Sequence, residues 1–148
     1  MRVELREAVE GDVPILFRNQ ADPEASAMAA FPSRDWEAFV AHRARIDANP
    51  DALVRTILVD GEVAGDIGSW REGDDRAVGY WIGRTFWGRG VATAALRAFL
   101  EVETTRPLIA HVAAHNVGSR RVLEKCGFDV VREQNVDGVD ELVTSLLV

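Results

Sequence analysis

The sequence predicts an α/β (α+β) fold, with a mixed, mostly antiparallel central sheet of about six to seven strands flanked by about four helices. Two observations predict it. Strand and helix signals alternate along the chain. Consecutive hairpins in the middle of the chain then lead into strand–helix–strand units, a combination that requires both antiparallel and parallel pairing. Because 148 residues match the usual size of one domain, we expect one domain over residues 1–148.

The first third of the chain is expected to supply one strand and two helices. Asp12 is a candidate N-cap for the first helix, and Ser33 for the second. Asn49 precedes a proline, which ends the second helix. In order, the predictions are a strand over 3–8, a helix over 13–20, an irregular stretch over 21–32 and a helix from 33 to 49.

The middle of the chain predicts a three-stranded meander. Asp60 and Gly61 form the dipeptide that most strongly signals a two-residue hairpin turn. A second turn contains Gly73. The predicted strands lie over residues 54–59, 63–70 and 78–82.

The last third predicts two helices and three strands. Apolar residues recur with helical spacing over 91–103, and Gly127 is the residue type expected just after a helix end. We expect the final strand to be exposed, where it could pair two copies of the chain into a homodimer. The predicted elements are a helix over 91–103, a strand over 108–113, a helix from Asn116 or Ser119 to Cys126, and strands over 128–134 and 142–148.

Composition excludes several classes of protein. The net charge of −7 disfavours nucleic-acid binding, which needs a basic surface. No apolar run approaches the ~20 residues of a membrane span, and the charged N-terminus has no apolar signal core. The single cysteine, Cys126, permits no intramolecular disulfide, so a cytoplasmic setting is expected. Three histidines without zinc-site spacing predict no metal site.

Positive charge is concentrated in one part of the chain. Residues 76–123 carry seven arginines and two acids, a balance of +5, whereas the remainder has a balance of −12. A basic segment in an acidic chain indicates a bound polyanion, the alternative being a set of solvated helix faces. The acidic remainder would attract a cationic amine such as a protein N-terminus, a polyamine or an aminoglycoside.

A candidate anion site follows the strand over 78–82, where a turn containing glycines opens a helix. Helix starts leave backbone N–H groups without partners, and glycine lets the backbone approach a phosphate closely. This segment is not a Walker loop, because it lacks the lysine and the hydroxyl residue of that motif. It is not a dinucleotide-binding loop, because it lacks the third glycine. We expect a pyrophosphate to be held by Gly83, Arg84, Gly88, Arg89, Gly90, Val91, Ala92 and Thr93.

Two motifs in this region resemble those of one family. The run Trp87-x-x-Gly90-x-Ala92 resembles the acetyl-CoA loop of the GNAT family of N-acetyltransferases, whose general form is [Gln/Arg]-x-x-Gly-x-[Gly/Ala]. Trp at the first position is common in the branch that acetylates ribosomal-protein N-termini. Residues 115–128 resemble that branch's signature Asn-x-x-Ser…Leu-Glu-Lys-x-Gly-Phe, with Asn116 and Ser119 in place. The resemblance covers most of the chain from Val54 on.

The resemblance implies the GNAT fold and the direct transfer of an acetyl group from acetyl-CoA to a primary amine in a ternary complex. It implies that Trp87 belongs to the cofactor loop and that the backbone near Ile82 stabilises the thioester carbonyl. It also implies that Asn116 hydrogen-bonds the pantetheine arm and that Ser119 protonates the departing thiolate. Many members use a tyrosine for that last role, but Leu123 stands at its position.

The residue that would deprotonate the amine is not fixed by these motifs. Asp66 is a candidate because an acid inside a strand, close to Gly65 and Gly68, is unusual. Glu133 and His111 are weaker candidates for the same role. Without an evident acid and base, the alternative is a catalytically silent module that binds or senses acyl-CoA.

Overall fold

In a computed structural model that describes all 148 residues, the strands form one seven-stranded sheet in the order β1-β2-β3-β4-β5-β7-β6. Only the pair β4 and β5 is parallel, and all other neighbours are antiparallel. The predicted fold class is confirmed. The strands are β1 (Val3–Arg6), β2 (Leu53–Val59), β3 (Glu62–Glu72), β4 (Asp75–Ile82), β5 (Leu108–Ala113), β6 (Asp129–Val136) and β7 (Val139–Leu146).

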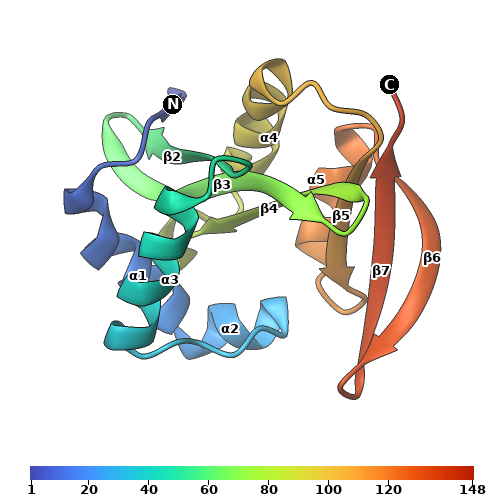
Figure 1. Cartoon of the computed structure of the whole chain (residues 1–148), viewed down its shortest axis with the longest axis horizontal. Helices are drawn as coiled ribbons and strands as arrows, with labels where there is room; N and C mark the ends of the chain where they lie inside the picture. The colour runs from blue at the N-terminus through green and yellow to red at the C-terminus, as the bar shows by residue number, and fades with distance from the viewer.

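Helices cover both faces of the sheet (Figure 1). One face carries the three N-terminal helices, and the other carries the two helices that follow β4 and β5. None of these helices is long and apolar enough to cross a lipid bilayer. The helices are α1 (Val13–Ala21), α2 (Pro23–Ala29), α3 (Trp36–Ala48), α4 (Val91–Val102) and α5 (Val117–Lys125).

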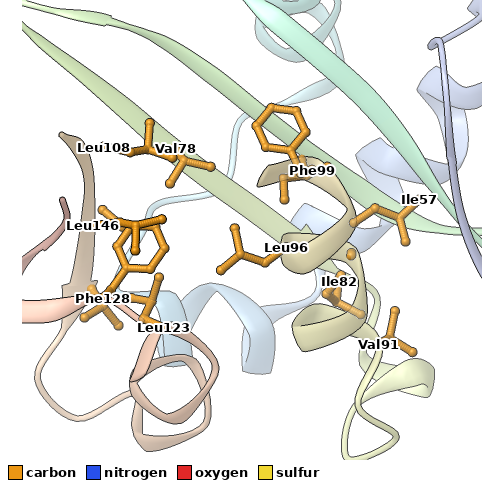
Figure 2. Packing of buried hydrophobic residues seen from close by; sticks show 14 of the residues in the cluster. Ile57, Val78, Ile82, Val91, Leu96, Phe99, Leu108, Leu123, Phe128 and Leu146 are labelled. Carbon is orange, nitrogen blue, oxygen red and sulfur yellow. The ribbon is translucent and has the colours of Figure 1, made fainter. Parts of the chain in front are cut away.

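The main core lies between the sheet and α4, as Figure 2 shows. Leu96 and Phe99 of α4 are fully buried, as the helical spacing of apolar residues predicts. They meet Val78 and Ile82, which lie on one face of β4 because side chains alternate along a strand. Burying a side chain such as that of Phe99 stabilises the fold by about 2–3 kcal/mol.

The hairpin turn at Asp60 and Gly61 is confirmed. Both residues have positive φ angles, 49° and 82°, as a type I′ turn requires. The turn sets the register of β2 and β3 as far as Leu58, and a shift of one residue between Ile57 and Leu58 then places Thr56 opposite Asp66. Asp66 in turn lies opposite Trp81 of β4, so the register brings the acid next to the C-terminal end of β4.

Asp12 precedes α1 as predicted, but its side chain does not cap α1 and instead accepts a hydrogen bond from the Val9 amide at 3.0 Å. Its carboxylate is buried and accepts hydrogen bonds from both terminal nitrogens of Arg6, each at 2.8 Å, and from Thr56 Oγ1 at 2.7 Å. The Arg6 hydrogen bonds hold the pKa of Asp12 far below its usual range despite burial. Asp12 therefore joins α1 to β1 and β2.

Three expectations about local structure are wrong. Asp35, and not Ser33, caps α3 by accepting a hydrogen bond from the Ala38 amide. Residues 23–29, expected to be irregular, form α2, which Asp22 caps by accepting a hydrogen bond from the Glu24 amide. The final strand β7 is not at the edge, because it lies between β5 and β6. The edge strand is β6, which exposes Val130 and Val131, so a homodimer through an edge stays a prediction, now about β6.

Candidate active site

The sheet opens between β4 and β5. The two strands pair only at their first residues, Arg76 with Leu108 and Ala77 with Ile109, and then separate. We call this separation the strand divergence. Because the strands are parallel, their C-terminal ends lie at the same edge, and β4 leads into the loop before α4 while β5 leads into α5. The two sequence motifs therefore meet at the strand divergence.

The loop between β4 and α4 has a conformation that its own residues fix. Gly88 and Gly90 have φ angles of 74° and 76°, a conformation that glycine adopts without strain. The indole of Trp87 donates a hydrogen bond to the Ile82 carbonyl at 2.9 Å, which fixes the loop to the end of β4. Trp87 thus braces the cofactor loop that the motif predicts.

Six consecutive backbone amides, from Gly88 to Thr93, make no well-formed hydrogen bond within the chain. The first intrahelical bond of α4 comes from the Ala94 amide to the Gly90 carbonyl. The loop residues from Trp87 to Gly90 are exposed, and a Cβ at either Gly88 or Gly90 would meet no atom within 4 Å. A row of free donors at the start of a 12-residue helix, on an open surface, fits a diphosphate.

Of the other residues predicted to hold the pyrophosphate, some are anchored in the fold and some are free. Val91 is buried and Ala92 packs against the core, so they anchor the helix start and present only their amides. Arg89 makes no ion pair, and its guanidinium lies 5.5 Å from the centre of the Phe86 ring. Arg84 instead pairs with Asp22 at 2.9 Å and with Glu24. The structure therefore leaves Arg89 available to an anion and commits Arg84 to α2.

The end of β4 offers a further amide to the strand divergence. The Gly83 amide donates to the Ala64 carbonyl of β3 at 2.8 Å. Alternate amides of an extended strand point to opposite edges, so the amide of Ile82 faces the side from which β5 has separated. The Ile82 side chain is buried in the core, which holds this amide in place.

Residues of the second motif lie across the strand divergence from Ile82. Asn116 caps α5 by accepting a hydrogen bond from the Ser119 amide at 3.2 Å. Ser119 Oγ lies 2.6 Å from the hydroxyl of Tyr80 on β4. Burial raises the pKa of Tyr80 to about 12 despite this contact. The sequence carries no signal for this contact of Tyr80, because its partner is 39 positions away in the chain.

Asp66 lies on the opposite face of the sheet, which the N-terminal helices cover. Its Oδ2 accepts a hydrogen bond from Arg43 of α3 at 2.6 Å. Its Oδ1 accepts none from another side chain, and the side chain is 23% exposed. Burial raises the pKa of Asp66, and Arg43 opposes that rise. One oxygen of the carboxylate is therefore occupied by Arg43, and no side chain occupies the other.

The two weaker candidates for the base lie elsewhere. Glu133 is exposed on the edge strand β6. Both ring nitrogens of His111 have carboxylate partners, Nδ1 with Glu141 at 2.6 Å and Nε2 with Glu72 at 3.2 Å. His111 thus lies within a polar network between β3, β5 and β7, and neither candidate contacts Ile82.

Helix α2 reaches across the two strand ends. The Arg84 pair joins it to the loop after β4, and His115, which follows β5, contacts the Ala27 carbonyl through Nε2 at 3.0 Å. Phe31, just after α2, packs edge-on against Trp81 of β4. The Asp-Pro-Glu run at residues 22–24 is a typical helix start and could have revealed α2 in the sequence.

Comparisons with known proteins agree with this geometry. The profile of the acetyltransferase (GNAT) domain matches residues 2–129. No curated protein matches the sequence significantly. One similar solved structure, a probable acetyltransferase, is 25% identical, with 98% of this chain and 92% of that chain covered at a TM-score of 0.77.

Two further structures share the fold. RimL, the ribosomal L7/L12 α-N-protein acetyltransferase, is 21% identical, with 99% and 90% coverage and a TM-score of 0.77. An N-acetyltransferase from Staphylococcus aureus Mu50 is 17% identical, with 99% of each chain covered and a TM-score of 0.82. The match of the GNAT domain profile to residues 2–129 shows that this chain belongs to the GNAT acetyltransferase family and is an acyltransferase.

Proposed function

We propose that this protein transfers an acetyl group from acetyl-CoA to a primary amine, either a protein N-terminus or a small-molecule amine, by direct attack in a ternary complex. The observation that carries the proposal is the row of six unused amides at the start of α4, directly beside the strand divergence. The family uses acetyl-CoA, and a RimL structure contains coenzyme A.

The residues of the loop fit the diphosphate of coenzyme A. The amides from Gly88 to Thr93 would donate hydrogen bonds to its oxygens, and the α4 dipole adds partial positive charge. Arg89 would add a full charge, since no carboxylate of the chain neutralises it. The side-chain amide of Asn116 keeps its nitrogen free while its oxygen caps α5, so it can donate to the pantetheine arm.

Bound acetyl-CoA would supply an activated acyl thioester. In the proposed arrangement, the Ile82 amide donates to the carbonyl oxygen as that oxygen gains negative charge. The amine nitrogen forms a bond to the carbonyl carbon while the carbon–sulfur bond breaks. Ser119 Oγ, on the other side of the strand divergence, donates to the departing sulfur.

The amine must lose a proton before it attacks. Deprotonating an alkyl ammonium with a pKa near 10 requires about 4 kcal/mol at pH 7, which a positioned base offsets. We propose Asp66 Oδ1 for this role, because Arg43 occupies only the other oxygen and Asp66 lies beside the strand pair that ends at Ile82. The raised pKa of Asp66 makes its carboxylate a better proton acceptor.

A silent acyl-CoA-binding module is the second candidate. Leu123 occupies the position of the family's usual tyrosine and is buried in the core, so it contributes no acid. The loop amides would bind coenzyme A equally well in both cases. The two functions differ only in turnover.

A thiol-release assay separates them. Acetyl-CoA is incubated with the protein and a panel of amines: an N-terminal peptide, a polyamine and an aminoglycoside. Free thiol is measured alongside calorimetric binding of acetyl-CoA. Thiol release that depends on one amine supports the transferase, and tight binding without release on any amine supports the silent module. No binding heat with acetyl-CoA would contradict both.

A further inference from the structure

Tyr80 is the only tyrosine in the chain, and it links the two sides of the strand divergence. It lies on the same face of β4 as Val78 and Ile82, and its ring packs against the core. Its hydroxyl contacts Ser119 Oγ of α5 at 2.6 Å. The proposed donor to the departing sulfur is therefore already bonded to a second hydroxyl.

The direction of this hydrogen bond decides what Ser119 can do. Each hydroxyl has one hydrogen. If Ser119 donates to Tyr80, its hydrogen is unavailable to a ligand; if Tyr80 donates, the Ser119 hydrogen is free to point toward the strand divergence. A phenol is the stronger donor of the two. With a pKa of about 12, Tyr80 keeps its hydrogen throughout the neutral range.

We propose that Tyr80 is a positioning residue that donates its hydroxyl hydrogen to Ser119 Oγ and so aims the Ser119 hydrogen at the departing sulfur. This inference rests on the proposed acetyl transfer. The backbone amide of Ser119 donates to Asn116 of the same motif. Asn116 thus holds the Ser119 backbone, and Tyr80 holds its hydroxyl group.

The pair acts as a hydrogen-bond donor rather than as a proton relay. Moving a proton from a phenol of pKa about 12 to a thiolate of pKa about 8.5 is unfavourable by roughly a thousandfold or more. As the carbon–sulfur bond breaks, the sulfur takes the bonding electron pair and accepts the Ser119 hydrogen bond. The thiolate then leaves and takes its proton from water.

Kinetics test the pairing through Tyr80→Phe, which removes one oxygen and keeps the ring. We expect kcat to fall about tenfold, with KM for both substrates within twofold of wild type. Ser119→Ala is expected to lower kcat at least as much, and the double variant no further than Ser119→Ala alone. A Tyr80→Phe kcat within twofold of wild type, or a double variant that shows the product of the two losses, would overturn the proposal.

A matched control separates positioning from general packing. Thr144 Oγ1 of β7 donates to the Ala110 carbonyl of β5 at 3.0 Å, so Thr144→Val deletes another buried hydroxyl bond of the same sheet. We expect Thr144→Val to reduce stability but not kcat. An equal loss of kcat in Thr144→Val and Tyr80→Phe would reduce Tyr80 to a structural role.

A spectroscopic readout is independent of turnover. Because Tyr80 is the sole tyrosine, ¹³Cζ-labelled tyrosine yields one resonance. We expect Ser119→Ala to shift this resonance, and coenzyme A to shift it in wild type but not in Ser119→Ala. If wild type transfers no acetyl group, the proposed function fails, yet the resonance still decides the pairing, since identical spectra for wild type and Ser119→Ala would refute it.

Discussion

The guanidinium of Arg43 and the carboxylate of Asp66 lie 2.6 Å apart and join α3 to the middle of β3. Arg43 is almost completely buried, and its Nε atom has no hydrogen-bond partner. Removing the carboxylate entirely would leave a buried cation without compensation, a change that destabilises proteins by about 3–5 kcal/mol. Asp66 therefore has a structural role, and any catalytic role must use its other oxygen.

Asp66→Asn separates these two roles, because the amide retains an acceptor for Arg43 but cannot take a proton. We expect kcat/KM to fall about a hundredfold with a smaller loss of stability. A base works when it is unprotonated, so wild-type kcat/KM should decline as the pH falls below the raised pKa of Asp66. This decline of kcat/KM at acidic pH, the acidic limb of the pH profile, should be absent in Asp66→Asn.

The matched control for Asp66 is Glu133→Gln, which removes an exposed carboxylate on the edge strand. We expect it to keep wild-type rates across the pH range. If Asp66→Asn retains wild-type kcat/KM and the acidic limb, the base lies elsewhere and the Arg43–Asp66 pair is only structural.

Arg84 and Arg89 are expected to differ in their effect on acetyl-CoA. Arg89→Ala should raise Kd about tenfold, since a charge-assisted hydrogen bond contributes about 1.5–3 kcal/mol. Arg84→Ala should leave Kd within twofold, because its guanidinium pairs with Asp22 and Glu24. Calorimetry on both variants measures this difference. Equal losses would show that Arg84 also reaches the cofactor.

Gly90→Glu tests the proposed diphosphate site at the start of α4. The new carboxylate would stand on the open surface where the diphosphate is proposed to bind, so we expect acetyl-CoA binding to disappear. Gly138 in the β6–β7 turn is a matched control, since it has a similar positive φ of 85° and equally open surroundings. Gly138→Glu should bear a similar backbone strain of about 1–2 kcal/mol yet bind normally. If Gly90→Glu binds acetyl-CoA with an unchanged Kd, the diphosphate does not bind at the start of α4.

Features set by neighbours in the chain were predictable from the sequence. The Asp60-Gly61 turn, the apolar face of α4 and the free amides that follow β4 all depend on residues a few positions apart. They were sufficient for the β2–β3 hairpin, for α4 and for the loop that precedes it. The short helix α2 was missed because its run of small residues has no apolar periodicity, and contacts with distant residues hold it.

Features set by distant partners were not predictable in this way. A count of charges assigns Arg84 to the basic middle of the chain, but its partner Glu24 lies 60 positions earlier. Arg76 of the same segment is likewise bound to Glu103. Only the fold decides which arginines remain free. The Tyr80–Ser119 contact and the occupied oxygen of Asp66 depend on the same kind of long-range pairing.

Glu103, just after α4, should make stability sensitive to acid. Its Oε1 accepts from Ser69 Oγ at 2.5 Å and from Arg76 Nε at 2.6 Å, and its Oε2 accepts from the Thr105 amide at 3.2 Å. Burial alone would raise the pKa of Glu103, but these hydrogen bonds outweigh it and lower the pKa to about 2. The folded state therefore binds this proton less tightly than the unfolded state does.

A lowered carboxyl pKa stabilises the fold above the ordinary value of 4.5 and loses that effect as the pH falls toward 2. The contribution is of order 3 kcal/mol at neutral pH. Because glutamine does not ionise, urea unfolding should show wild type more stable than Glu103→Gln by about that amount at pH 7. This difference in the free energy of unfolding should narrow sharply by pH 2.5. Asp12 titrates in the same direction in both proteins and cancels in the comparison. A difference of the same size at both pH values would mean that packing, and not ionisation, makes Glu103 important.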